Sequence, residues 1–302
     1  MPETHDITRI PGPIRGPSKL ADLTEQIGNR FASPDYIPPM LPTVAVELLD
    51  LSRYVDIDLR RIARHVETDP ILAGRVMSLV QSPMYSGRAD IRNLEQAVFR
   101  IGLNTLRDLV LQAALNMRLF TTPGYSSTME RVRRHSTATA HIARLIARNT
   151  DQDPEEAFLC GLLHDVGIAA ALIVVDEIYG DGPRPQVAAI WPAVEAIHET
   201  SGMLLARIWN LPGELANVIG YHHDFTANGY QDKRVATLHL AERIAAKLGR
   251  GIITSSPSRG SRSLVDVTAQ NLIAAARLHL DLSHETLGDI VRESQEQLDA
   301  IG

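Results

Sequence analysis

Histidine and carboxylate side chains are the groups of this chain whose number and spacing point to metal chemistry. The sequence contains 11 histidines and one cysteine, Cys160. A single cysteine excludes a disulfide framework and a cysteine-based zinc cluster, and it fits a reducing compartment. Any metal centre would therefore be built from imidazole nitrogens and carboxylate oxygens, which are ligands for Zn, Mn, Fe or Ni.

Five of the histidines have neighbours that suit a metal ligand. They are His135, His164, His198, His222 and His223. Asp165 directly follows His164, so one helix end offers both a nitrogen and an oxygen ligand. For each histidine alone, a hydrogen-bonded core residue is the simpler explanation. Five of them on the core side of four consecutive helices favour a shared site, because a helical bundle can bring such side chains to one interior point.

The other six histidines lack ligand-like neighbours. They are His5 in the N-terminal segment and His65, His141, His239, His279 and His284 in helical stretches. We expect no metal-binding role for them.

Helices must position these side chains, and helical signals extend from about residue 20 to the end of the chain. Asp69-Pro70 and Asp153-Pro154 each place a capping carboxylate before a proline at the first helical position. Asn93-Leu94-Glu95-Gln96 resembles a capping box. Apolar spacing predicts further helices over 187–209, 213–223, 233–248 and 264–298. No segment alternates with period two, so the predicted fold class is all-α.

Glycine and proline mark the breaks between these helices. We expect loops at 82–92 and 249–263, a turn at 180–183 and a subdomain boundary at 121–124. Residues 1–27 contain four prolines and no long apolar run, which predicts a flexible leader rather than a signal peptide. The most apolar stretch, 168–175, is shorter than the ~20 residues that span a bilayer. The sequence therefore predicts a soluble, cytoplasmic protein without membrane contact.

The charge balance bears on nucleic-acid binding. The formal net charge is −6, whereas such binding depends on lysine and arginine neutralising phosphates. The basic residues cluster locally at Arg60, Arg61 and Arg64 and at Arg131, Arg133 and Arg134. We interpret both clusters as solvated helix faces, with an anion or partner site as the alternative.

Several motifs, taken in order, resemble the HDOD branch of the HD superfamily. In the first half they are Leu41-Pro42-Thr43, Thr68-Asp69-Pro70-Ile71-Leu72, Ser82-Pro83-Met84-Tyr85 and Leu94-Glu95-Gln96-Ala97-Val98-Phe99-Arg100-Ile101-Gly102. In the second half they are Leu162-Leu163-His164-Asp165-Val166-Gly167, Trp209-Asn210-Leu211-Pro212 and His222-His223. The resemblance covers about residues 28–295. It implies a multi-helix fold with an N-terminal HDOD subdomain (28–122) packed on an HD-like helical subdomain (123–298).

The resemblance also implies a ligand set for one or two divalent ions of Fe, Mn, Zn or Ni. The first ligands would be His135, His164 and Asp165, as in the wider superfamily. The additional histidine ligands of the related HD-GYP phosphodiesterases correspond to His198, His222 and His223. The distal ligand is normally Asp, and here the matching position is Glu242, a carboxylate one methylene longer.

Other departures fall on residues that handle substrate in HD-GYP enzymes. Ile168 stands where those enzymes have a lysine, and Arg131 stands where they have a further metal-binding glutamate. Their Gly-Tyr-Pro motif is reduced to Asn228-Gly229-Tyr230-Gln231. The chain thus keeps the metal-ligand pattern and loses the pattern of residues that hold substrate.

We therefore expect a regulatory signal-transduction module that is catalytically weak or inactive and keeps a metal-capable pocket. HDOD proteins resemble bacterial signalling components, so the implied partners are a response regulator, a kinase or a cyclic-dinucleotide enzyme, with a nucleotide as candidate ligand. The alternative is a metal-dependent phosphohydrolase or phosphodiesterase acting on a nucleotide or cyclic dinucleotide. In that case Asp165 would bridge the ions or position the nucleophile. A purely structural or nucleic-acid-associated helical protein has only the arginine clusters in its favour.

Overall fold

The computed structural model describes residues 17–41, 45, 60, 62–63, 66, 70–80, 91, 93–118, 122–223, 232–252 and 273–301. Within these ranges the chain forms helices and no strand, which confirms the all-α fold class. The α-helices are α1 (Pro17–Ala32), α4 (Pro70–Val80), α5 (Leu94–Arg118), α6 (Ser126–Arg148), α7 (Pro154–Leu163), α8 (Val166–Tyr179), α9 (Val187–Ile208), α10 (Gly213–Gly220), α11 (Lys233–Ala245) and α13 (His284–Ile301). A 3-10 turn, η2 (Pro123–Tyr125), precedes α6, a π-helical turn, η4 (Ala246–Arg250), follows α11, and residues 273–279 are also helical.

Two of the capping residues read from the sequence begin helices, and the third, Asp69, lies outside the described residues. The Asn93 side chain accepts a hydrogen bond from the Gln96 backbone N–H at 2.8 Å, just before α5. The Asp153 side chain accepts one from the Glu155 N–H at 2.8 Å, just before α7. Each bond satisfies one of the N–H groups that a helix start leaves without a partner.

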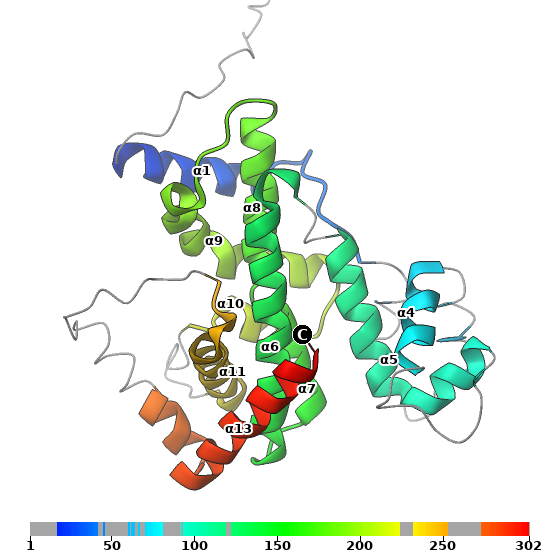
Figure 1. Ribbon diagram of the computed structural model, residues 1–302. Helices are drawn as coiled ribbons and strands as arrows, with labels where there is room; N and C mark the ends of the chain where they lie inside the picture. Colours follow the sequence, from blue (N-terminus) through cyan, green and yellow to red (C-terminus); the bar gives the residue numbers. More distant parts are fainter. Residues whose placement is uncertain are drawn as a thin grey trace, which may run out of the picture.

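The early helices α4 and α5 pack together to one side of a larger bundle formed by the later helices (Figure 1). Helix α5 bends at Gly102, where φ is +77°. Beyond the bend, Arg107 lies 2.6 Å from Glu155 of α7. Arg144 of α6 lies 2.6 Å from Asp108 and 2.8 Å from Glu155. This largely buried ion network joins α5 to α6 and α7.

The bundle is built mainly from helices that are adjacent in sequence. Helix α6 packs on α7, α8 packs on α9, and α11 closes the arrangement by packing on α6. The α6–α7 pair is in near backbone contact, since a Cβ at Gly161 would lie 2.6 Å from the Ala140 Cα. Only glycine allows this approach.

One stretch of the described residues, Pro154–Tyr179, is long and apolar enough to cross a membrane by length and composition alone. In the structure it is two helices, α7 and α8, interrupted at His164 and Asp165. Its most apolar window is 94% buried inside the protein. A core helix pair has these properties, so we interpret the stretch as the centre of the bundle.

Four predicted boundaries differ from the structure. The last predicted helix, 264–298, is broken at 280–283, between the helical residues 273–279 and α13. The leader was expected to reach residue 27, but α1 begins at Pro17, buries Leu23 and Ile27, and packs against α8 and α9. Helix α10 ends at Gly220 rather than at 223, so both histidines of the pair lie beyond it. Helix α11 ends at Ala245 and continues as the π-helical turn η4. Within the expected loop at 82–92 the structure describes residue 91 alone, and residues 228–231 and most of the loop at 249–263 lie outside the described residues.

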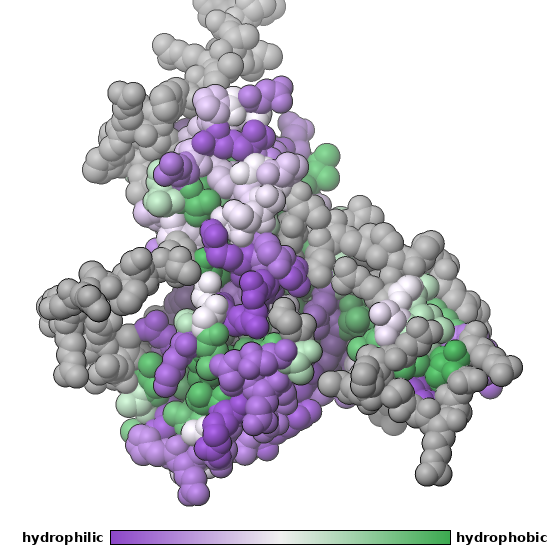
Figure 2. Space-filling model, viewed as in Figure 1, coloured by the Kyte–Doolittle hydropathy of each residue, from purple (hydrophilic) through white to green (hydrophobic). Residues whose placement is uncertain are grey.

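The last helix, α13, covers α6. It buries Ile290, Ser294 and Leu298, which are spaced four residues apart and therefore share one face. Its other side is rich in charged side chains, and hydrophilic residues dominate this part of the surface (Figure 2).

Candidate metal centre

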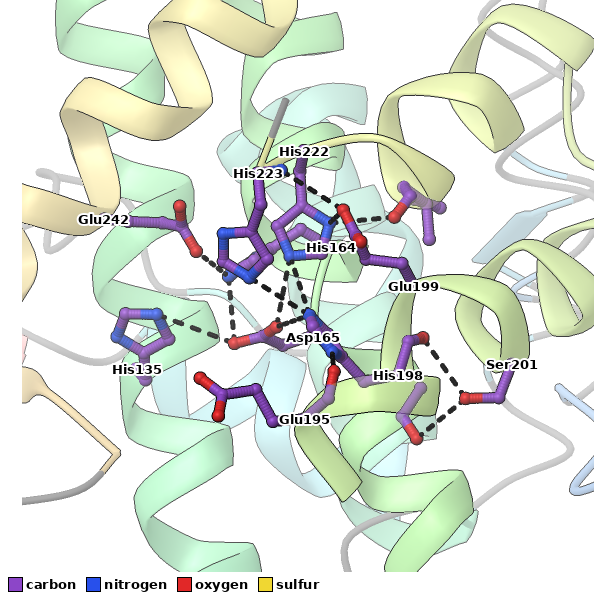
Figure 3. Close-up of polar contacts among 12 residues, drawn as sticks. His135, His164, Asp165, Glu195, His198, Glu199, Ser201, His222, His223 and Glu242 are labelled. Atoms are coloured by element: carbon purple, nitrogen blue, oxygen red, sulfur yellow. Dashed lines mark hydrogen bonds and ion pairs between the residues drawn. The ribbon is translucent and has the colours of Figure 1, made fainter. Parts of the chain in front are cut away.

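Seven candidate ligands predicted from the sequence converge in the middle of the bundle (Figure 3). Helix α6 carries His135, α9 carries His198 and α11 carries Glu242. The break between α7 and α8 carries His164 and Asp165, and the turn after α10 carries His222 and His223. The ligand set therefore depends on elements spread over more than 100 residues of the sequence.

The break between α7 and α8 is in close backbone contact with α9. A Cβ at Gly167 would lie 1.8 Å from the His198 carbonyl oxygen and 2.6 Å from the Gly202 nitrogen, both on α9. On the same contact, the Ser201 hydroxyl donates to the Gly167 carbonyl at 3.2 Å. Backbone contact of this kind fixes where Asp165 lies relative to His198.

Three of the imidazole rings are oriented by their own local backbone. In each case Nδ1 faces the carbonyl oxygen three residues earlier. These bonds join His164 to Gly161 at 2.8 Å, His198 to Glu195 at 2.6 Å and His222 to Ile219 at 2.8 Å. A carbonyl oxygen only accepts hydrogen bonds, so Nδ1 must carry a proton in all three rings.

His135 is held in the same way by a remote group. Its Nδ1 donates to the Arg250 carbonyl oxygen at 2.9 Å, across 115 residues of sequence. With Nδ1 protonated, a neutral ring leaves its Nε2 lone pair free. All four rings therefore present Nε2 as the atom that can bind a cation.

These free nitrogens face other acceptors. The Nε2 of His198 lies 3.2 Å from the Nε2 of His222 and 3.1 Å from the Nε2 of His223. The Nε2 of His164 lies 3.0 Å from an Asp165 oxygen and 3.2 Å from a Glu242 oxygen. Lone pairs this close repel one another unless a proton or a metal ion lies between them, so the donor set fits a metal cation.

Asp165 connects the two halves of the cluster. Its Oδ2 lies 3.0 Å from His164 Nε2 and 3.6 Å from His135 Nε2. Its Oδ1 lies 3.5 Å from His222 Nε2 and 3.9 Å from His198 Nε2. One group of ligand atoms thus comprises His135, His164, Asp165 and Glu242, and a second comprises His198, His222 and His223. Asp165 therefore directs one carboxylate oxygen toward each group.

The protonation behaviour of the cluster reflects this crowding. Burial lowers the pKa of His164, but the Asp165 and Glu242 carboxylates outweigh it and raise that pKa to about 10. Burial raises the pKa of Glu242, but its contact with His164 outweighs this and brings it to about 2. Burial lowers the pKa of His135. Burial, together with the neighbouring His222, lowers the pKa of His223 to about 4. Without metal, a proton on His164 therefore offsets the negative charge of the carboxylates.

Two groups that contact the cluster were not predicted from the sequence. The Glu199 side chain accepts from the His223 backbone N–H at 3.3 Å and lies 4.0 Å from His222 Nδ1. Its position directly after His198 is the one sequence feature that could have marked it. The Arg250 group is a backbone carbonyl and has no side-chain signature.

Two residues that depart from the HD-GYP pattern, Ile168 and Arg131, have different surroundings in the structure. Ile168 is buried at the start of α8. The guanidinium of Arg131 donates to the Thr128 hydroxyl of its own helix at 3.0 Å. Neither residue offers a metal ligand.

Among the histidines expected to have no such role, His239 on α11 is buried and His141 packs edge-on against Phe158. Neither contributes to the two groups of ligand atoms.

Comparison with known proteins shows what this chain and its fold are similar to. An uncharacterized protein of Treponema pallidum (strain Nichols) is 25% identical over 224 residues, which cover 71% of this chain and 42% of that protein. The chain thus matches less than half the length of this relative. An HDOD domain protein of unknown function from Geobacter sulfurreducens superposes with a TM-score of 0.66 at 24% identity, covering 93% of this chain and 97% of that one.

A second solved structure, a candidate metal-dependent phosphohydrolase from Shewanella amazonensis SB2B, superposes with a TM-score of 0.66 at 20% identity, covering 94% of this chain and 99% of that one. At these identities the superpositions establish the fold. The HDOD domain pattern itself matches residues 38–225, more than half of the sequence. The chain therefore belongs to the HDOD domain family.

Proposed function

We propose that this protein is a regulatory HDOD module whose central pocket binds one or two divalent transition-metal ions. The ligands would be His135, His164, Asp165, His198, His222, His223 and Glu242. The ions would hold α6, α7, α9 and α11 in one arrangement. The affinity of the protein for a partner or a nucleotide would then depend on whether the helices have that arrangement. The partners would be signalling proteins such as a response regulator, a kinase or a cyclic-dinucleotide enzyme.

One observation carries the metal assignment. The Nε2 atoms of His198, His222 and His223 approach within 3.1–3.2 Å, and the Nδ1 protons of His198 and His222 are already engaged by carbonyls. A neutral His223 can relieve its contact with His198 by carrying the proton on Nε2. The His198–His222 contact still brings two lone pairs together in the neutral rings, and a cation would turn it into a pair of ligand bonds. Fe, Mn, Zn and Ni all accept such mixed imidazole and carboxylate sites.

The residues around the centre favour regulation over catalysis. A lysine at the start of α8 would offer a cation to a phosphate, whereas Ile168 is buried and apolar. Arg131 is engaged with Thr128 on its own helix. The pocket therefore keeps metal ligands but has apolar or occupied side chains at positions that could handle a phosphate group.

A second candidate function is metal-dependent hydrolysis of a phosphate ester, favoured by the position of Asp165 between the two ligand groups. Paired metal ions supply activated water at neutral pH and neutralise charge on a phosphoryl group. Here Asp165 would hold the two halves in register, and Glu199 on the rim would fix the turn that carries His223. The name of the Shewanella structure points to the same class of reaction for that protein.

Metal content is the first test. Protein purified without chelators or metal-affinity steps should contain bound transition metal by elemental analysis. The double variant His164→Ala/Asp165→Ala should lose it and should unfold at lower denaturant concentration, because metal binding and folding are linked. His141→Ala, on α6 but outside the cluster, is the matched control and should keep its metal. Full metal content in the double variant would show that the ligands are misassigned.

Binding and turnover must then be measured separately to distinguish the two functions. A set of cyclic dinucleotides is titrated against the metal-loaded protein, and product formation is followed in parallel. The regulatory function predicts binding or partner association without turnover. Hydrolysis at enzyme-like rates that disappears in the double variant would instead establish the phosphohydrolase.

A further inference from the structure

The four oriented rings of the cluster are not supported equally. His164, His198 and His222 each bond to a carbonyl three residues earlier on their own helix or turn. His135 depends on the Arg250 carbonyl, 115 residues away. The support of His135 is therefore a tertiary contact, while the support of the other three forms with local secondary structure.

The turn that presents this carbonyl has an unusual backbone. Residues Ala246–Arg250 form a π-helical turn at the end of α11. Gly249 within it adopts φ +77° and ψ +17°, in the left-handed region. Residues other than glycine and asparagine adopt this conformation at a cost, because Cβ approaches the backbone. A Cβ at Gly249 would meet no atom of the described residues within 4 Å, so the requirement seen at this position is conformational.

The same turn is connected to the last helix. The Arg250 guanidinium donates to the Leu298 carbonyl oxygen of α13 at 3.4 Å. Leu298 lies on the buried face of α13, and this helix packs against α6, which carries His135. One residue thus touches α13 through its side chain and His135 through its backbone.

We propose that the Gly249–Arg250 turn is a positioning element for His135, through which α13 controls the half of the metal centre formed by His135, His164, Asp165 and Glu242. The proposal rests on the metal centre proposed above. A shift of α13 moves Arg250, and the Nδ1 of His135 then loses its acceptor. The ring becomes free to rotate or to carry its proton on Nε2 instead, and either change removes its lone pair from the site.

The effect is confined to one half of the centre. The rings of His198 and His222 keep their own carbonyl acceptors when the turn moves. The second group of ligands therefore retains its orientation. A shift of α13 would therefore lower the affinity for one ion and leave the other bound.

The test uses backbone variants of the full-length protein. Gly249→Ala strains the turn without adding a contact, and Gly249→Asn is the conservative variant, since asparagine tolerates the left-handed region. Gly180→Ala is the control for backbone strain away from the centre: Gly180 also has a positive φ, of +50°, with ψ −126°, and among the described residues its Cβ would meet one atom, at 4.0 Å. Each variant is titrated with Mn²⁺, and the imidazole ¹⁵N resonances of the metal-free protein are recorded to report which ring nitrogen carries the proton.

We expect Gly249→Ala to weaken one Mn²⁺ site about tenfold, the equivalent of a left-handed penalty of about 1.4 kcal/mol, and to leave the other unchanged. The Nδ1–H signature of His135 should be reduced in the same variant. Gly249→Asn should restore both properties, and Gly180→Ala should leave both unaltered. Equal weakening of both sites, or an unchanged His135 spectrum in Gly249→Ala, would overturn the proposal.

Arg250→Ala tests the connection to α13, because it removes the bond to Leu298 and keeps the backbone carbonyl. We expect a smaller loss of affinity at the same site, about threefold. No change in this variant would overturn the control by α13. The spectra are taken on metal-free protein, so the positioning role is tested even if the wild type binds no Mn²⁺, an outcome that would refute the proposed metal centre instead.

Discussion

Gly167→Ala is the substitution by which the close packing at the α7–α8 break can be tested most directly. The added Cβ would lie 1.8 Å from the His198 carbonyl oxygen. Ordinary van der Waals contact begins at 3.4 Å, so α8 and α9 would have to separate locally by 3.4 − 1.8 = 1.6 Å. The opposing atoms belong to the backbone, so no side-chain rotation relieves the clash.

The displacement is large compared with the spacing of the ligands. His198 Nε2 lies 3.1 Å from His223 Nε2, so a backbone shift of 1.6 Å is half of that distance. We expect Gly167→Ala to lower the free energy of unfolding by about 3 kcal/mol, the upper part of the range for overpacking. We also expect loss of metal from the group that contains His198.

Denaturant unfolding and elemental analysis measure the two effects. Gly74→Ala is the control, because it makes the same change inside α4, where a Cβ would meet no atom of the described part of the chain within 4 Å. It should stabilise the protein by about 0.5–1 kcal/mol. A Gly167→Ala protein as stable as the wild type, with its metal content intact, would refute the packing argument. The stability measurement decides this point whether or not metal is bound.

Two further predictions concern buried charge. Burial, aided by neighbouring guanidiniums, lowers the pKa of His141 from 6.5 to about 4, so the unfolded chain binds more protons than the folded one between these pH values. His141 should therefore destabilise the fold as the pH falls from about 6.5 to about 4, by up to about 3 kcal/mol. His141→Gln should flatten this part of the plot of unfolding free energy against pH. An unchanged plot would contradict the lowered pKa of His141. Asp108→Ala removes the carboxylate 2.6 Å from Arg144 in the network between α5 and α6, and it should cost about 3 kcal/mol because a largely buried guanidinium loses a partner. The control is Asp151→Ala, which removes the exposed partner of Lys233 and should leave the unfolding midpoint almost unchanged. Equal effects of Asp108→Ala and Asp151→Ala would show that the buried ion network contributes little to stability.

Local signals account for the part of the fold that the sequence predicted. Asn93 and Asp153 cap helices in the structure because the capping bond involves only the next few residues. The absence of period-two alternation correctly excluded a sheet among the described residues. The five histidines and Asp165 could be named because buried histidines beside an aspartate form an unusual pattern, whereas Glu242 was named through the resemblance to the HD superfamily. Their use as metal ligands stays a prediction, although the structure brings them together.

Long-range contacts account for what the sequence did not reveal. Helix α10 was expected to reach residue 223 but ends at Gly220, where a Cβ would lie 2.0 Å from the Met203 side chain of α9. The prolines before α1 favoured a flexible leader, while the burial of Leu23 and Ile27 depends on α8 and α9. The Arg250 carbonyl could not be foreseen, since every residue has one. In each case the deciding partner lies far away in the sequence.

The pairing of sequence-adjacent helices has a consequence for the order of folding. The α6–α7 and α8–α9 contacts link neighbouring segments, and such contacts form early because little loop entropy is lost. The contact of α11 with α6 bridges a far longer loop. We expect an intermediate in which both helical pairs have formed while Glu242 and the Arg250 carbonyl are still absent from the centre. Refolding should then proceed in two stages, with the His135 ring ordered only in the second.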